Sequence, residues 1–368
     1  MKLDAIELHR IAMPLVRPFR TSFGLQTERD VLLVRAMSGD LEGWGECVAL
    51  AQPVYSSEHV AGAHLVMADH LVPRLLAADD VTGRGVAHVL DDVVGHRMAK
   101  GALELAVLDA ELRGNSMPLA RYLGGVRDRV DAGVSVGIAD SIEALLEEVA
   151  LYIEQGYRRI KLKIQPGWDR QPLVAVREEF GEDLPLQVDA NTAYDPSTVG
   201  ALETLDDLGL LLIEQPFEEE DLRQHADLAR RIRTPVCLDE SITSARSTAE
   251  AIRQGACEIV NVKAGRVGGY VEAARVHDVA VAMNTPLWCG GMLETGIGRA
   301  ANVALASMAG FTLPGDTSAS DRYYAEDVTD PFVMVDGQLA VPTGPGIGVA
   351  PRPEFLSAVT QSVERFTR

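Results

Sequence analysis

Two lysines lie two residues apart in the apolar run RIKLKI, residues 159–164. Side chains at positions i and i+2 of a strand point to the same face, so Lys161 and Lys163 are expected to share one face of this strand. On an open surface the pair would need no explanation. In an enclosed site two adjacent like charges are costly, so their presence there would need a chemical reason.

Four further ionisable residues follow Lys163 at intervals of 24 to 26 residues: Asp189, Glu214, Asp239 and Lys263. Each lies at the C-terminal end of an apolar run. A repeat of one strand and one helix returns the chain to the same level each time, so these side chains are expected to meet at one edge. In a (β/α) barrel that edge holds the active site.

The three carboxylates predict a metal site. A single Asp or Glu at a strand end usually caps a helix or pairs with an arginine, but Asp189, Glu214 and Asp239 recur in register. If they converge, they cannot all stay ionised without a cation. A hard divalent ion suits them: Mg²⁺ is the first expectation, with Mn²⁺ or another divalent ion as the alternative.

The lysines predict acid–base chemistry. Lys163 and Lys263 belong to strands that face each other across a barrel mouth, and Lys161 and the metal would supply a positive field that lowers their pKa. This arrangement suits removal of a proton next to a carboxylate, through an enediolate. Two opposed lysines permit racemisation, whereas one lysine used twice permits elimination.

The elements that would position these residues follow from periodicity. The first 60 residues read as antiparallel strands with a turn at Ser38-Gly39-Asp40, and the next 60 read as helices, including one at residues 97–114. Seven apolar runs then alternate with helical segments, at 132–138, 159–164, 184–190, 208–216, 234–241, 257–265 and 285–291. We favour a barrel over an open doubly wound sheet, because no glycine-rich nucleotide turn follows the first strand. The segment AGRVGG, residues 264–269, reads as a plain turn, and the last 45 or so residues are expected to pack on the N-terminal segment.

Composition limits the partners. The 368 residues carry 34 basic and 54 acidic side chains, a net charge of −20, which disfavours nucleic acid and anionic membranes. Neither a signal-peptide pattern nor a run of about 18 apolar residues is visible, so we expect a soluble cytoplasmic protein. The four cysteines have no CxxC spacing and are expected to be buried thiols.

The ordered set of KxK, three carboxylates and a later lysine resembles the enolase superfamily, muconate-lactonising branch. More specifically, the sequence is similar to the N-succinylamino acid racemase/o-succinylbenzoate synthase group. The resemblance covers nearly the whole chain and includes PFRTSFG (18–24), GWGEC (43–47), QVDANTAY (187–194), LLIEQP (211–216), CLDESI (237–242), VKAGRVGG (262–269) and LPGDTSASDRYY (313–324).

The resemblance implies an α/β fold, a modified (β/α)₇β TIM-type barrel with an α+β capping domain. The implied domains are residues 1–125 (cap), 126–320 (barrel) and 321–368 (a C-terminal segment that returns to the cap). It also implies that Lys163 and Lys263 are the acid/base pair supported by Lys161, with Asp189, Glu214 and Asp239 as Mg²⁺ ligands. The implied substrate-pocket residues are Asn191, Ser135, Phe19, Leu50, Tyr55, Gly291, Met292, Leu293 and Tyr323, with Arg20 beside Phe19 in the first of two closing loops. Phe19, Leu50 and Leu293 could equally serve packing alone.

The implied activity is N-acyl, especially N-succinyl, amino acid racemisation, o-succinylbenzoate synthesis for menaquinone, or both, by a homo-oligomer that acts on a small-molecule carboxylate. A dipeptide epimerase or muconate-type cycloisomerase would share the same catalytic core. Outside the superfamily, a Schiff-base lysine enzyme and a non-catalytic binding barrel are the alternatives.

Overall fold

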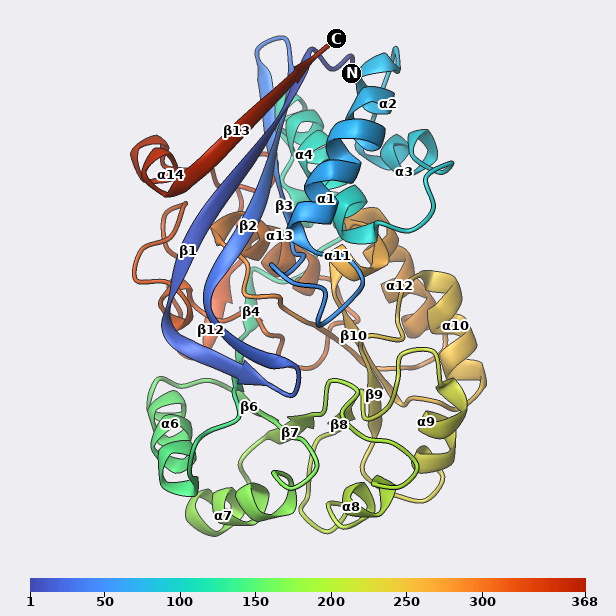
Figure 1. Cartoon of the computed structure of the whole chain (residues 1–368), viewed down its shortest axis with the longest axis vertical. Coiled ribbons are helices and arrows are strands. Elements are labelled where there is room, and N and C mark those ends of the chain that lie inside the picture. The colour runs from blue at the N-terminus through green and yellow to red at the C-terminus, as the bar shows by residue number, and fades with distance from the viewer.

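The computed structural model describes all residues 1–368 and divides into a cap and a barrel (Figure 1). The cap contains an antiparallel sheet in the order β13-β1-β2-β3, with a helical layer packed on one face. Its strands are β1 (Ala5–Thr21), β2 (Gly24–Ser38), β3 (Leu41–Cys47) and β13 (Thr360–Thr367). The helices of this region are α1 (Val60–Val66), a π-helical turn (Met67–Leu71), α2 (Val72–Ala77), a 3₁₀ turn (Gly83–Gly85), α3 (Val86–Val89), α4 (Arg97–Gly114), α5 (Leu119–Leu123) and, near β13, α14 (Pro353–Val359).

Helix α4 packs against β3 because two glycines of that strand leave room for it. A Cβ atom on Gly43 would lie 2.2 Å from the carbonyl oxygen of Ala106, and one on Gly45 would lie 2.1 Å from that of Ala102. The backbones can approach this closely only without side chains at the two positions. The alternation GWGE therefore brings the end of β3, and Glu46 with it, next to the barrel.

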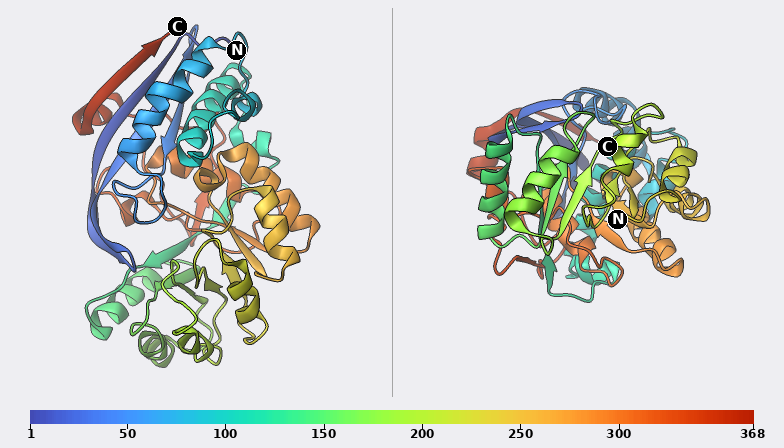
Figure 2. Two further views of the ribbon diagram at one scale, coloured as in Figure 1. Left: turned by 45° about the vertical axis from the view of Figure 1, so that its right-hand side comes forward. Right: turned by 90° about the horizontal axis from the view of Figure 1, so that it is seen from below.

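The barrel contains seven parallel strands in the order β11-β10-β9-β8-β7-β6-β5, and its helices lie on the outside of this curled sheet (Figure 2). The strands are β5 (Gly133–Val136), β6 (Arg159–Lys163), β7 (Leu186–Asp189), β8 (Ile213–Glu214), β9 (Val236–Leu238), β10 (Ile259–Val262) and β11 (Leu287–Cys289). The helices are α6 (Ile142–Glu154), α7 (Arg170–Phe180), α8 (Val199–Glu203), α9 (Leu222–Ala229), α10 (Ala245–Arg253), α11 (Ala264–Val267), α12 (Tyr270–Ala282) and α13 (Gly296–Ala306). The remaining elements are a two-stranded pair, β4 (Arg129–Asp131) with β12 (Gln338–Ala340), and a 3₁₀ turn (Ser320–Arg322).

An irregular segment, residues 311–318, connects the two edges of the seven-stranded sheet. On one side the amide of Asp316 donates to the carbonyl of Cys289 in β11, at 2.8 Å. On the other side the amide of Gly133 in β5 donates to the carbonyl of Gly315, at 2.7 Å. We call residues 311–318 the closing segment, because its hydrogen bonds complete the barrel where no regular eighth strand forms.

The predicted elements are largely confirmed. Each of the seven barrel strands lies within one of the seven apolar runs, and helix α4 has the predicted bounds of 97 and 114. The C-terminal strand β13 pairs with β1, as expected for a tail that packs on the N-terminal segment. All four cysteines are buried free thiols. None of the helices combines the length and apolar character needed to cross a membrane.

One local prediction is wrong. The segment 264–269 is not a plain turn, because its first four residues form helix α11 before Gly268 and Gly269 adopt positive φ. The domain boundaries after residues 125 and 320 remain a proposal.

Two buried carboxylates of the cap bind the N-termini of two barrel helices. Glu46 accepts hydrogen bonds from the hydroxyl of Thr295 at 2.7 Å and from the amide of Gly298 at 2.9 Å, at the start of α13. Glu104 accepts one from the amide of Val271 at 3.0 Å, at the start of α12. The free amides of a helix N-terminus attract anions, so these contacts fix the body of the cap to the barrel.

Candidate active site

The residues predicted to be catalytic lie together at the C-terminal ends of adjacent barrel strands. Lys161 and Lys163 belong to β6, and Lys163 pairs in register with Asp189 of β7, which pairs with Glu214 of β8. Asp239 follows the last residue of β9, and Lys263 follows the last residue of β10. All six side chains are buried. The regular spacing in the sequence thus corresponds to one level of the barrel.

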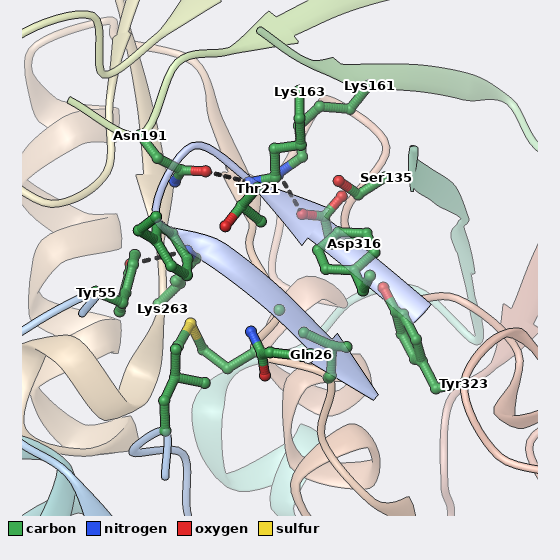
Figure 3. A pocket seen from close by; sticks show the side chains of 16 residues that line it. Thr21, Gln26, Tyr55, Ser135, Lys161, Lys163, Asn191, Lys263, Asp316 and Tyr323 are labelled. Atoms are coloured by element: carbon green, nitrogen blue, oxygen red, sulfur yellow. Dashed lines mark hydrogen bonds and ion pairs between the residues drawn. The ribbon is translucent and has the colours of Figure 1, made fainter. Parts of the chain in front are cut away.

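Each lysine bonds to a different carboxylate. The Nζ of Lys163 donates to Asp189 Oδ2 at 2.6 Å and to the side-chain oxygen of Asn191 at 2.5 Å. The Nζ of Lys263 donates to Asp239 Oδ2 at 2.6 Å. Lys163 and Lys263 enter the pocket from different sides (Figure 3). The geometry therefore places one amine on each of two sides of the enclosed space.

These ion pairs determine the charge states. Burial alone would raise the pKa of Asp189, but the ammonium groups of the three lysines hold it well below its ordinary value. Burial and the neighbouring charge of Asp189 raise the pKa of Glu214 well above the ordinary value. Burial alone would lower the pKa of Lys263, yet Asp239 and other nearby groups hold it well above. A lysine so paired is an ammonium ion, and it becomes a base only when the carboxylate charge beside it is drawn away.

The three carboxylates offer oxygens that suit a cation. As the side chains stand, no group of three or more His, Cys, Asp and Glu residues is arranged to hold one metal ion, and lysine ammonium groups pair with these carboxylates. However, Glu214 Oε2 and Asp239 Oδ1 are buried acceptors without a hydrogen-bond partner. Unpartnered buried oxygens are rare and call for an explanation. Carboxylate oxygens of this kind fit a hard divalent ion.

Two residues that the sequence did not point to support this set. Gln215, with a positive φ of 37°, accepts hydrogen bonds from the amides of Asp239 at 3.0 Å and Ser241 at 3.2 Å. Glu240 accepts from the side-chain amide of Asn191 at 2.9 Å, which turns the oxygen of Asn191 toward Lys163. No charge periodicity or motif marks either role in the sequence.

A pocket opens beside the lysines, and its walls include all nine residues predicted for substrate binding. These are Phe19, Leu50, Tyr55, Ser135, Asn191, Gly291, Met292, Leu293 and Tyr323. Thr21, Phe23, Gln26 and Asp316 also line it and were not predicted. Thr21, Phe23 and Gln26 flank the tip of the β1–β2 hairpin, so proximity to Phe19 was the available signal.

The cap contributes one side chain directly to the lysine cluster. The hydroxyl of Tyr55 accepts a hydrogen bond from Lys263 at 2.9 Å and donates to Asp239 Oδ2 at 3.1 Å (Figure 3). By contrast, the predicted loop residue Arg20 does not line the pocket. Its guanidinium pairs with Asp140 at 2.7 Å, and its carbonyl accepts from the amide of Ile138 at 2.9 Å, so it ties the hairpin tip to the barrel.

Comparison with known proteins agrees with this geometry. Residues 5–124 match the N-terminal domain of the mandelate racemase/muconate lactonizing enzyme family, and residues 144–355 match the enolase C-terminal domain-like family. This chain belongs to the enolase superfamily. A superfamily relative from Amycolatopsis sp., named N-succinylamino acid racemase, is 62% identical over 98% of both chains.

A second relative, from Geobacillus stearothermophilus, is named o-succinylbenzoate synthase and is 42% identical over 100% of this chain and 96% of its own. Among solved structures, an enolase superfamily member from Listeria innocua Clip11262 matches with a TM-score of 0.95. It is 37% identical and covers 100% of this chain and 99% of that one. Superfamily members generally use a divalent metal, in keeping with the unpartnered carboxylate oxygens described above.

Proposed function

We propose that this protein removes the proton next to a substrate carboxylate and forms an enediolate. Its substrates are N-acyl, particularly N-succinyl, amino acids, which it racemises, and the cyclohexadiene carboxylate that is dehydrated to o-succinylbenzoate. The observation that carries the proposal is the placement of Lys163 and Lys263 on different sides of one pocket, each beside a carboxylate. The names of the 62% and 42% identical relatives support the substrate class.

Lys163 and Lys263 act as the acid/base pair. In racemisation one amine takes the proton from one face of the α-carbon and the other ammonium delivers a proton to the opposite face. In dehydration a single lysine removes the proton and then protonates the departing hydroxide on the same face. Lys161 supplies a fixed positive charge for the enediolate.

Asp189, Glu214 and Asp239 would hold the divalent ion, with Mg²⁺ as the first candidate. When bound, the ion would draw carboxylate charge away from Lys163 and Lys263 and would stabilise negative charge on the substrate. The unpartnered oxygens of Glu214 and Asp239 support this assignment.

The pocket walls fit a substrate with a carboxylate and an apolar or acyl arm. Phe19, Leu50, Met292 and Leu293 provide apolar surface. The buried hydroxyl of Ser135 has no hydrogen-bond partner, so it is free to bond to a polar group of the arm. A cytoplasmic location, a homo-oligomeric state and a role in menaquinone synthesis belong to this proposal as well.

Parallel assays of N-succinylamino acid racemisation and of cyclohexadiene dehydration test the proposal. We expect at least one activity, loss of it in EDTA, and recovery when Mg²⁺ or Mn²⁺ is returned. We also expect exchange of the substrate α-proton in D₂O. Absence of exchange with both substrates would refute the proposal and favour a binding barrel.

Two alternative enzymes are separated by the same set of measurements. A Schiff-base lysine would form a covalent adduct that borohydride traps, whereas our proposal predicts no adduct. Exchange with a dipeptide or conversion of muconate, without turnover of the succinyl substrates, would assign the site to a dipeptide epimerase or muconate-type cycloisomerase.

A further inference from the structure

Asp316 lies on the closing segment, and its carboxylate is buried in the pocket wall. One oxygen accepts a hydrogen bond from Lys161 Nζ at 2.6 Å, and the other accepts from Arg159 at 2.9 Å. Both partners belong to β6, across the pocket from the backbone bond that Asp316 makes to β11. The carboxylate thus links the segment that completes the barrel to the strand that carries the lysine pair (Figure 3).

This contact explains why Lys161 and Lys163 differ although they share one face of β6. Lys161 makes its hydrogen bond to Asp316, whereas Lys163 bonds to Asp189 and Asn191. The two ammonium groups are therefore directed toward opposite neighbours, the closing segment and β7. Without Asp316 the nearest anions to Lys161 would be two proposed metal ligands.

Those two ligands are already close. The Nζ of Lys161 lies 3.3 Å from Asp189 Oδ2 and 3.3 Å from Glu214 Oε2, without a hydrogen bond to either. A small movement of the flexible lysine side chain would bring its charge onto these oxygens. An ammonium group that bonds there competes with a cation for the same ligands.

We propose that Asp316 is a positioning residue that holds Lys161 away from Asp189 and Glu214 and so keeps these carboxylates available to the metal ion. Arg159 takes part by fixing the second oxygen of Asp316. Its guanidinium is buried and lies over the ring of Trp288, so its own position is restricted. The inference deepens the proposed function, and it concerns the metal site whatever substrate the pocket accepts.

The test is the affinity of Asp316→Asn for Mg²⁺ or Mn²⁺, measured by calorimetry without substrate. Asparagine keeps the size but loses the charge, so we expect Lys161 to turn to Asp189 and Glu214 and the metal affinity to fall by about tenfold or more. Because substrate is absent, the result does not depend on which reaction is catalysed. Failure of the proposed substrates would leave it unaffected.

A double-mutant cycle separates positioning from a general structural role. If Asp316 acts through Lys161, adding Asp316→Asn to Lys161→Met causes no further loss of metal affinity. Asp109→Asn is the matched control, since Asp109 is also buried and paired with an arginine, Arg113 at 3.0 Å, but does not line the pocket. It is expected to lower the melting temperature and leave metal affinity unchanged. Unchanged metal affinity in folded Asp316→Asn, or losses that add in the double variant, would overturn the proposal.

Discussion

Lys163 and Lys263 are equivalent in chemistry but not in surroundings. Lys163 bonds only to barrel groups, Asp189 and Asn191, whereas Lys263 also bonds to Tyr55 of the cap. Removal of one amine should therefore have an effect that depends on which face of the substrate it serves.

In Lys263→Ala we expect racemisation to fall by about 10²- to 10⁴-fold in both directions, because each direction needs both amines. Exchange of the α-proton for deuterium should persist for one enantiomer, whose proton Lys163 removes. Proton NMR in D₂O with each pure enantiomer measures this. Lys163→Ala should show the opposite preference, and loss of exchange with both enantiomers in one variant alone would contradict the two-base assignment.

Asp239→Asn should weaken binding of the divalent ion while leaving the fold intact. Asp239 has one unpartnered buried oxygen, and its other oxygen accepts from Lys263 and Tyr55. The amide retains hydrogen-bonding capacity but cannot offer the same charge to a cation. Calorimetry and circular dichroism measure the two effects, and unchanged metal affinity would remove Asp239 from the ligand set.

At the scale of elements, the contacts of Glu46 and Glu104 with α13 and α12 connect cap and barrel. Burial raises the pKa of Glu104 to about 8, although the amides at the start of α12 oppose this. An ordinary glutamate has a pKa near 4.3 in an unfolded chain. Because the folded pKa is the higher one, folding is favoured most at low pH, where Glu104 is protonated in both states. That contribution is lost progressively as pH rises through about 8.

Glu104→Gln should therefore reduce the decline of unfolding free energy between pH 5 and pH 8, since a neutral amide has no charge to bury. Urea unfolding at several pH values gives the slope. Glu354→Gln, at an exposed site in the first turn of α14, is the control and should leave the slope unchanged. A slope in Glu104→Gln equal to that of the parent protein would show that ionisation of this carboxylate does not limit docking of α4 on α12.

The elements that could be foreseen are those with a repeating signal. Periods of 24 to 26 residues placed Lys163, Asp189, Glu214, Asp239 and Lys263 on one edge, and their burial agrees with that. Asp316 could not be found in this way, because its segment makes single hydrogen bonds to two separate strands instead of forming a strand of its own. Gln215 was missed for a similar reason, since its role depends on a positive φ that a sequence pattern does not reveal.

At the scale of the whole molecule, the site is closed by the cap. The β1–β2 hairpin tip, residues 18–27, reaches the barrel through few contacts, including the exposed pair of Arg20 with Asp140 and a bond from Ser22 to the carbonyl of Asn191 at 3.4 Å. Exposed ion pairs stabilise by about 1 kcal/mol at most. The tip is therefore expected to open more readily than the rest of the cap sheet.

A bound substrate or analogue should slow amide hydrogen exchange in residues 18–27 and around Tyr55 more than in the paired part of β1, residues 5–12. Mass spectrometry of peptic peptides measures this. Asp140→Asn, which removes the partner of Arg20, should speed exchange at the tip without the ligand. Uniform protection throughout the cap would mean that the hairpin does not move separately.

The pairing of β13 with β1 has a consequence for how the chain is made. Ala5 lies opposite Thr367 and His9 opposite Val363, so both ends of the chain meet in one sheet (Figure 1). During synthesis β1 emerges first and must wait for nearly the entire chain before its partner strand appears. Throughout that interval it presents an unpaired edge, the kind of surface on which neighbouring nascent chains associate. The step most exposed to misassembly is therefore the last one, the arrival of residues 360–367 beside a strand made at the beginning.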